Sequence, residues 1–369
     1  MVKTLKVLLV ADEYFSWGVY GGFGYFTRKL ARELLKKNVE VEVIVQRISN
    51  LQKPIGETEL IDGVPVTTLP RKKLSKIKQK KLYETDADII HSQCGMYDTY
   101  LTFKRNRGKA KIITVQDLRT KEETDSYAHL EKTSGYPWYK RLWARYVRSC
   151  FNKAMKNADV VACHARLLFP KVKKIFNVES SIMLPNFIDV PQGSIKKSNK
   201  PSVVWLARLD AIKQPELCFK LAEDTPDVDF YILGDAHKAY KRTVERLIQR
   251  YKGAKNLHLL GFQSGEVKET ILSKSWILIN TSAYECLPVS FLEALAHKCA
   301  ILSTRNPDDY TVNFGAWCST DNLKNGLKWL LDNDRWRELG EKGYEQAKSI
   351  HSTEKGIEAH INLYRKLLE

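Results

Sequence analysis

Residues 276–304, WILINTSAYECLPVSFLEALAHKCAILST, contain a short apolar run, a polar loop, a longer segment of helical length and a second apolar run. Short apolar runs bounded by loop residues are typical of buried strands. Pro288 stands where a helix would begin, because proline is tolerated in a first helical turn. The stretch therefore predicts strand, loop, helix over 288–298 and strand, which is the repeating unit of a parallel sheet.

The same alternation extends in both directions along the chain. In the first half we expect strands at 6–11, 39–45, 87–92, 111–117 and 158–164. In the second half we expect them at 202–208, 228–235, 256–262, 276–282 and 299–304. Strands separated by helices form parallel sheets covered on both faces. We therefore predict an α/β protein with two doubly wound, Rossmann-like domains that face each other across a cleft.

The boundary between the two series is a stretch rich in Pro, Gly, Ser, Asn and Lys, without helical or strand periodicity. We predict an N-terminal domain over 1–185, a linker over 186–200 and a C-terminal domain over 201–352. The tail at 353–369 has apolar residues near helical spacing and is expected to form a terminal helix. Return of this helix to the N-terminal domain is one alternative for its packing.

Composition limits the kind of protein. The chain has 369 residues, 43% of them hydrophobic, and lacks a run of about twenty apolar residues that would span a membrane. Its seven cysteines are scattered, which is typical of reduced thiols in a cytoplasmic protein. The formal charge of +17 favours anionic partners such as nucleotides, acidic glycans or anionic lipid, although simple solvation of the lysines remains an alternative.

Residues at strand ends carry the chemistry of such folds, because ligands bind beyond the carboxyl ends of parallel strands. Gly21 and Gly22 precede a helix and suit a phosphate cradle, although the spacing does not match a dinucleotide fingerprint. Arg208 and Lys213 follow the first strand of the second half. A guanidinium fork and a point charge suit a diphosphate, while two solvated cations are the plainer alternative.

Glu285 and Glu293 lie on either side of Pro288, one in the loop and one within the predicted helix. Eight residues of helix rise about 12 Å, far more than the spacing of two carboxylates that act on one bond. We therefore expect the two glutamates to hold different parts of one extended ligand. The backbone N–H groups of Val289 and Ser290, at the start of the helix, would point at an anion between them.

The chain resembles the retaining nucleotide-sugar glycosyltransferases of family four, which have the GT-B fold. The matching motifs are the Gly21-Gly22 loop, ADIIHS, LPNFID, Arg208 with Lys213, ILGD, LGF and the two glutamates. They occur in the family's order along nearly the whole chain.

The resemblance implies a role for each matching residue. Arg208 and Lys213 would stabilise the leaving diphosphate, and Glu285 would lie at the transferred sugar. These three are the predicted catalytic residues. The predicted donor-binding residues are Gly21, Gly22, Gly261, Phe262, Gln263, Leu287, Val289, Ser290 and Glu293.

Two further positions follow from the same resemblance. His91, in ADIIHS, and Gln116 are candidate contacts of the donor sugar. Gln116 departs from the family, which often has histidine at this position. A glutamine can hydrogen-bond a hydroxyl but cannot transfer a proton.

The expected donor is a UDP- or GDP-sugar, with no cofactor and no obligatory metal ion. The resemblance implies that Arg208 and Lys213 do the work of a cation. Two D-x-D strings, at 86–88 and 227–229, precede predicted strands and are interpreted as turn residues rather than metal ligands.

The acceptor is expected to be a glycan or a lipid-linked glycan bound by the N-terminal domain. The basic run at 71–81 suits an anionic membrane surface, an acidic glycan or simple solvation. The basic, aromatic helix at 136–155 suits the same membrane surface, although packing of its apolar stripe against the sheet, with solvated arginines, is the plainer alternative. We therefore expect a cytoplasmic protein, peripheral on the inner face of the membrane. Nucleic acid is disfavoured because no nucleic-acid-binding motif is present. A GT-B epimerase and a non-catalytic basic binding protein remain the alternative functions.

Overall fold

The computed structural model describes residues 4–15, 21–47, 52–93, 96–130 and 138–369. The chain divides into two compact units. Unit 1 comprises Met1–Thr120, Gly135–Asn186 and Thr353–Glu369, and unit 2 comprises Lys121–Ser134 and Phe187–Ser352. Each unit is built on its own sheet of largely parallel strands, so the predicted α/β class with two Rossmann-like units is confirmed.

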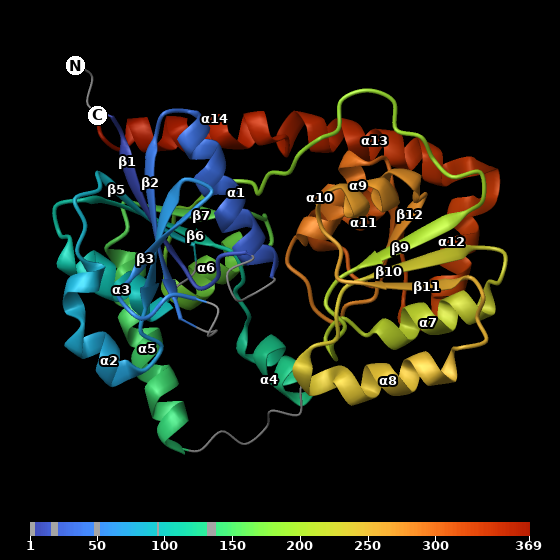
Figure 1. Cartoon of the computed structure of the whole chain (residues 1–369), viewed down its shortest axis with the longest axis horizontal. Helices are drawn as coiled ribbons and strands as arrows, with labels where there is room; N and C mark the ends of the chain where they lie inside the picture. Colours follow the sequence, from blue (N-terminus) through green and yellow to red (C-terminus); the bar gives the residue numbers. More distant parts are fainter. Residues whose placement is uncertain (1–3, 16–20, 48–51, 94–95, 131–137) are drawn as a thin grey trace. The chain divides into compact units, whose positions relative to one another are not determined.

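Unit 1 contains an eight-stranded sheet in the order β3-β4-β2-β1-β5-β6-β7-β8 (Figure 1). Its pairs are parallel except for β3 with β4. The strands are β1 (Lys6–Ala11), β2 (Glu40–Gln46), β3 (Thr58–Ile61), β4 (Val64–Leu69), β5 (Ile89–Gln93), β6 (Ala110–Val115), β7 (Val160–Cys163) and β8 (Ile182–Met183). The helices are α1 (Gly22–Lys36), α2 (Lys73–Lys78), α3 (Met96–Arg105), α5 (Trp138–Lys156), α6 (Leu168–Phe176) and α14 (Thr353–Lys366), with a 3-10 turn η1 at Lys80–Tyr83.

The hairpin of β3 and β4 was not predicted. Its two-residue loop is Asp62-Gly63, and both residues have positive φ, 52° and 81°. Asp-Gly is the preferred pair for a type I′ turn, whose twist matches that of the flanking strands. The turn was therefore readable in the sequence, but β3 is short and half exposed, and β4, although mostly buried, is interrupted by Pro65 and two threonines and lacks a clear apolar run.

Helix α14 belongs to unit 1 because its buried face meets the sheet there. The Tyr364 hydroxyl lies 2.7 Å from Nδ1 of His91 in β5, and Nε2 of His91 lies 2.7 Å from the Thr114 hydroxyl in β6. His360 packs beside this group, with its ring 5.8 Å from that of His91. Burial lowers the pKa of His360 to about 4 and keeps the pKa of His91 well below its usual range.

Unit 2 contains a six-stranded, entirely parallel sheet in the order β11-β10-β9-β12-β13-β14. Helices α7 and α8 lie on one side of it and α9 and α10 on the other (Figure 1). The strands are β9 (Ser202–Leu206), β10 (Asp229–Leu233), β11 (Leu257–Gly261), β12 (Ile277–Asn280), β13 (Ala300–Ser303) and β14 (Gly315–Trp317). The helices are α4 (Lys121–Leu130), α7 (Pro215–Asp224), α8 (Lys241–Arg250), α9 (Gly265–Lys274), α10 (Val289–Ala296), α11 (Tyr310–Phe314), α12 (Leu323–Leu331) and α13 (Arg335–Ile350).

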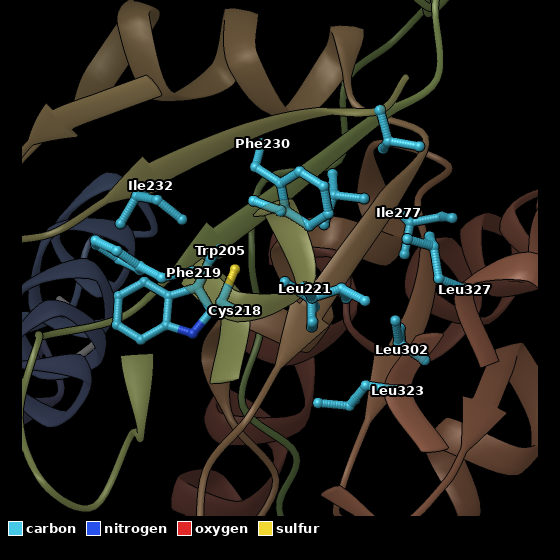
Figure 2. Close-up of a cluster of buried hydrophobic side chains, with 14 of the residues drawn as sticks. Trp205, Cys218, Phe219, Leu221, Phe230, Ile232, Ile277, Leu302, Leu323 and Leu327 are labelled. Atoms are coloured by element: carbon cyan, nitrogen blue, oxygen red, sulfur yellow. The ribbon is translucent and has the colours of Figure 1, made fainter. Parts of the chain in front are cut away.

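The core of unit 2 is a continuous apolar cluster between the sheet and helices α7 and α12. Figure 2 shows the indole of Trp205 beside Phe219 and Ile232, and Phe230 near Ile277. Leu327 belongs to the same cluster and is almost fully buried. Because these strands are buried on both faces, their sequences are nearly continuous apolar runs rather than alternating ones. This core holds the carboxyl ends of β9, β10 and β12 in fixed register.

We expect acid to destabilise unit 1 through its buried neutral histidine. The pKa of His360 is about 4 in the folded protein and about 6.5 in an unfolded chain, so only the unfolded chain gains a proton between these values. Stability is therefore lost as the pH falls from about 6.5 towards 4. Replacing His360→Leu should remove about 2–3 kcal/mol of the difference in unfolding free energy between pH 7.5 and pH 4.5.

The measurement is urea unfolding of the full chain at the two pH values. His237→Leu is the matched control, because His237 is exposed. An unchanged pH dependence in the His360 variant would show that this histidine does not titrate as argued.

Candidate functional site

The loop after β9 holds the predicted cations Arg208 and Lys213 around one buried carboxylate. The Arg208 guanidinium contacts Oδ2 of Asp210 through Nε at 2.8 Å and through NH2 at 2.7 Å. Oδ1 of Asp210 accepts the backbone N–H groups of Ile212 and Lys213, both at 3.0 Å. Asp210 is only 4% exposed, so it both orients Arg208 and closes the turn that leads to Lys213.

The loop after the neighbouring strand β12 meets Lys213. Nζ of Lys213 lies 2.6 Å from Oε1 of Glu285. The same oxygen also accepts hydrogen bonds from Ser282 Oγ at 2.6 Å and from Asn280 Nδ2 at 3.0 Å. The Thr281 hydroxyl donates to the backbone carbonyl of Lys213 at 2.6 Å. The fold thus brings together, at one edge of the sheet, three residues that are up to 77 positions apart, namely Arg208, Lys213 and Glu285.

The loops after β10 and β11 continue this edge. The Gly234 N–H donates to the Gly261 carbonyl at 2.8 Å, and the Phe262 N–H donates to Oδ1 of Asp235 at 3.0 Å. Asp235 in turn accepts the Leu209 N–H at its carbonyl, 3.0 Å away. These hydrogen bonds link the predicted segment 261–263 to the Arg208 loop. Phe262 is 38% exposed, so its aromatic ring is available at the surface of this segment.

Helix α10 begins directly after Glu285 on the same edge. Pro288 is its N-cap rather than its first helical residue, and Leu287 before it is buried. The helix therefore starts at Val289 and Ser290, as predicted, and its partly positive end adjoins the loop that carries Glu285. The positions of Leu287, Val289 and Ser290 are compatible with donor binding, and their role stays a prediction.

Glu293 lies inside α10 and pairs with Lys268 of α9. The lysine is largely buried and the glutamate side chain is 12% exposed. The two predicted glutamates thus hold different lysines, Glu285 holding Lys213 and Glu293 holding Lys268. This separation agrees with the expectation that they serve different parts of a ligand.

The predicted glycines of unit 1 lie at the start of α1. Gly21 is the N-cap and Gly22 the first helical residue. The part of the glycine-rich loop at 16–20 lies outside the described residues. A helix that starts with glycines presents backbone N–H groups to a ligand, and the role of Gly21 and Gly22 stays a prediction.

His91 and Gln116 are buried within unit 1, which weighs against the predicted sugar contacts. His91 is 0% exposed and has hydroxyls of Tyr364 and Thr114 at its two ring nitrogens. Gln116 is 2% exposed and exchanges hydrogen bonds with Asn186 at 3.2 and 3.4 Å. Both side chains have structural partners, because the sheet interior must satisfy each buried polar group.

Three residues of this edge were missed by sequence reasoning. Asp210 lies between Arg208 and Lys213 in the sequence, but its role depends on the turn geometry. Lys268 pairs with a residue 25 positions away and leaves no local signal. Gly234 has a local signal, ILGD, and a structural reason: a Cβ there would lie 1.7 Å from the Ala207 carbonyl oxygen.

The D-x-D residues have the structural roles expected of turn residues. Asp86 pairs with Lys6 at 2.6 Å and Asp88 accepts the Lys6 N–H at 3.1 Å. Asp229 pairs with Lys200 at 2.8 Å. Within the described ranges no group of three or more His, Cys, Asp or Glu side chains is arranged to hold a metal ion. In the same ranges, every helix is too short or too polar to cross a bilayer.

Comparison with known proteins covers both units. Residues 188–348 match the family of glycosyl transferases group 1, and residues 6–165 match the starch synthase catalytic domain family. A comparison with curated protein sequences gave no match.

Solved structures resemble the chain over its whole length. Sucrose-phosphate synthase from Thermosynechococcus elongatus is 15% identical, with a TM-score of 0.77 and 99% of each chain covered. Anabaena HepE in complex with UDP-glucose is 13% identical, with a TM-score of 0.72, covering 98% of this chain and 99% of HepE. A TarM variant from S. aureus, with UDP and α-GlcNAc-glycerol, is 12% identical at a TM-score of 0.70, covering 98% and 100%.

Two parallel α/β units, with the candidate site at the carboxyl ends of the second sheet, match the GT-B fold. The match to the glycosyl transferases group 1 family covers residues 188–348, which lie in unit 2. The resemblance that the motifs indicated is therefore confirmed.

We expect Gly234→Ala to damage the site by displacing backbone. Gly234 has φ of 142°, and the added Cβ would overlap the carbonyl oxygen immediately before Arg208. Strain of this kind costs on the order of 1–3 kcal/mol, and relief would move the Arg208 loop. The midpoint temperature of thermal unfolding and the turnover number should both fall.

Gly253→Ala is the matched control, because a Cβ there meets no atom within 4 Å. Its unfolding free energy should stay within about 0.5 kcal/mol of the unsubstituted protein. Equal behaviour of the two variants would contradict the close approach at Gly234.

Proposed function

We propose that the protein transfers a sugar from a nucleotide-diphosphate sugar to a hydroxyl group of a glycan or lipid-linked glycan, with retention of anomeric configuration. The main support is the meeting of Arg208, Lys213 and Glu285 at one sheet edge of unit 2, held by Asp210. The match of residues 188–348 to the glycosyl transferases group 1 family supports the reaction class. UDP-bound HepE and TarM support a uridine donor among the alternatives, UDP- and GDP-sugars.

In this proposal the diphosphate lies against the loop after β9 and the start of α10. Arg208 supplies a planar pair of donors and Lys213 a point charge, and both strengthen their contacts as negative charge grows on the leaving group. Val289 and Ser290 add backbone N–H groups from the helix end. These contacts stabilise the transition state more than the ground state, which is the requirement for catalysis.

The remaining predicted residues hold the ends of the donor. Glu293, with Lys268 beside it, would bind the ribose hydroxyls. Phe262 would lie against the base, since its ring is exposed at the end of β11. Glu285 would accept a hydroxyl of the transferred sugar while remaining paired with Lys213.

Retention is proposed by attack from the leaving-group side. The bond between the anomeric carbon and the diphosphate oxygen breaks, and the acceptor oxygen bonds to the same face of that carbon. The acceptor proton passes to a departing phosphate oxygen. Glu285 is then a positioning group and not a nucleophile, which agrees with the engagement of its Oε1 by Lys213, Ser282 and Asn280.

We also propose that unit 1 binds an anionic membrane surface at the cytoplasmic face. Leu142 and Tyr146 on α5 are 53% and 45% exposed, and Ile77 on α2 is 38% exposed. The two helices are neighbours through Tyr97, whose ring is 6.0 Å from that of Tyr146 and under the ammonium of Lys76. Exposed apolar side chains among lysines and arginines are typical of a surface that enters an anionic interface.

We expect Arg208→Ala and Lys213→Ala each to reduce kcat by between about tenfold and a thousandfold, as for loss of one transition-state donor. Asp210→Asn should also reduce kcat, because Arg208 loses the charge that orients it. The donor is first selected by a thermal-shift screen of UDP-, GDP-, ADP- and dTDP-sugars. The assay then follows release of the nucleoside diphosphate together with NMR of the anomeric product.

Arg246→Ala is the control for this series, since Arg246 is an exposed arginine of α8 in the same unit. Near-normal turnover in both the Arg208 and Lys213 variants would exclude the leaving-group role. A product with inverted anomeric configuration would contradict the retaining mechanism but not the transferase activity.

Membrane association should depend on charge and on the exposed apolar residues. The protein should sediment with vesicles containing anionic lipid at low salt, and much less with neutral vesicles or at 0.5 M salt. Leu142→Ser with Ile77→Ser should weaken sedimentation. Leu60→Ser should not, although Leu60 on β3 is more exposed, at 70%, than Leu142, at 53%. Failure of the unsubstituted protein to sediment would refute this location.

A further inference from the structure

Unit 1 contains a cavity of about 470 Å³ at the carboxyl ends of its own strands. It lies at the position where ligands bind in open α/β sheets, and it is distinct from the residues of unit 2 described above. Its lining has a polar part and a larger apolar part. The apolar side chains are Phe23, Tyr97, Val115, Leu118, Trp143, Val147, Phe151 and Phe176.

The polar part of the cavity is centred on Asp12. This residue follows β1 and accepts one hydrogen bond in the described part of the chain, from Nε2 of Gln46, at a long 3.4 Å. Gln46 donates more strongly to Asp98, at 2.7 Å. Gln93 and Asp117 line the same end. The Asp12 side chain itself is exposed to solvent.

A carboxyl group in this setting gains from a hydroxyl donor. Asp12 is exposed, so water solvates its oxygens in the free protein, and an incoming O–H group takes the place of that water. The oxygens of Asp12 and Gln93 can accept hydrogen bonds from a polyol, and Arg71, which also lines the cavity, can donate to a hydroxyl oxygen. The polar end is therefore expected to hold a hydroxylated head group.

The wall beside Asp12 is rigid. Lys76 donates to both oxygens of Asp98 at 2.6 Å, and the Tyr83 hydroxyl donates to Oδ1 at 2.8 Å. Lys76 and Asp98 are both buried, so the interpretation of the basic run as solvated cations is wrong at Lys76. Because Asp98 is saturated by these donors, Asp12 is the carboxylate left to bind a ligand.

The apolar part is formed mainly by one face of α5. Trp143, Val147 and Phe151 recur at helical spacing and face the cavity, and Phe151 packs edge-on against Phe176 of α6 at 5.5 Å. Trp143 stacks at 5.3 Å on Tyr146, which is 45% exposed. The apolar lining thus adjoins the exposed apolar residues of α5.

We propose that this cavity binds an amphiphilic acceptor, in which a hydroxylated head group carries an apolar acyl, prenyl or aryl group. The role of this ligand as an acceptor rests on the proposed transferase function. Binding of the amphiphile to the cavity does not depend on that function. Asp12 and Gln93 would hold the head, and Trp143, Val147 and Phe151 the apolar group. A bare oligosaccharide satisfies the polar end but leaves most of the lining without an apolar partner, so it binds less tightly.

Binding to the full chain tests the proposal without any donor. The probes are methyl, butyl and octyl glycosides of glucose, galactose and mannose, together with glycerol and 1-octylglycerol, all below their micelle concentrations. Affinity from calorimetry should rise by up to about fourfold for each methylene buried, until the cavity is filled. For at least one head group the octyl compound should bind at least tenfold more tightly than the methyl compound or free glycerol.

Two variants separate the parts of the ligand. Asp12→Asn should weaken every hydroxylated probe while leaving the ratio between octyl and methyl compounds unchanged. Trp143→Ala should reduce that ratio and leave methyl glycosides nearly unaffected. Trp317→Ala, which removes a 60% exposed tryptophan of unit 2, is the matched control and should alter neither quantity.

The source of the apolar group is resolved by a second pair of probes. Tight binding of diacyl glucosyl lipid in neutral vesicles identifies a membrane lipid, and preference for an aryl glycoside in solution identifies a soluble aromatic acceptor. Either result supports the proposal that the cavity binds an amphiphilic acceptor. Equal affinity of octyl and methyl compounds for every head group, or tighter binding of unsubstituted oligosaccharides, would overturn it.

The two proposals fail separately. Sugar transfer or donor hydrolysis without any chain-length dependence leaves the proposed function standing and removes the amphiphile. If the protein lacks transfer activity but its binding depends on chain length and Trp143→Ala abolishes that dependence, the amphiphile proposal stands and the proposed function is removed.

Discussion

The buried carboxylate of Asp210 is the interaction on which the candidate donor site depends. One oxygen holds the Arg208 guanidinium and the other closes the turn that places Lys213. Lys213 then fixes Glu285 on the adjacent strand end. Removing the carboxylate would leave a cation and two amide groups without their partner, so the loss would spread through three loops rather than stay local.

Much of the fold could be predicted because each buried strand is a continuous apolar run. All ten predicted strands are present, with ends displaced by at most two residues. The missed strands β3, β8 and β14 are short and partly exposed and lie at sheet edges, whereas β4 is mostly buried but interrupted by Pro65 and two threonines. Hydrophobic periodicity therefore detects the strands that are continuous apolar runs.

The site was less predictable than the fold because its residues depend on pairing between distant positions. Strand-end reasoning found Arg208, Lys213 and Glu285, since parallel topology alone places them on one edge. It missed Lys268, whose partner is on another helix. The sugar contacts of His91 and Gln116 stay predictions, and both side chains are buried with hydrogen-bond partners. For those two, the motif gave the position along the strand but not the burial of the side chain.

The pairing of charges in unit 2 has a consequence for selectivity. Arg208, Lys213 and Lys268 each face a carboxylate, namely Asp210, Glu285 and Glu293. These six side chains together carry no net formal charge, although the whole chain carries +17. A small free anion such as inorganic phosphate must compete with these carboxylates and gains little. A larger molecule that also offers hydroxyl groups to the carboxylates meets both signs at once and is retained.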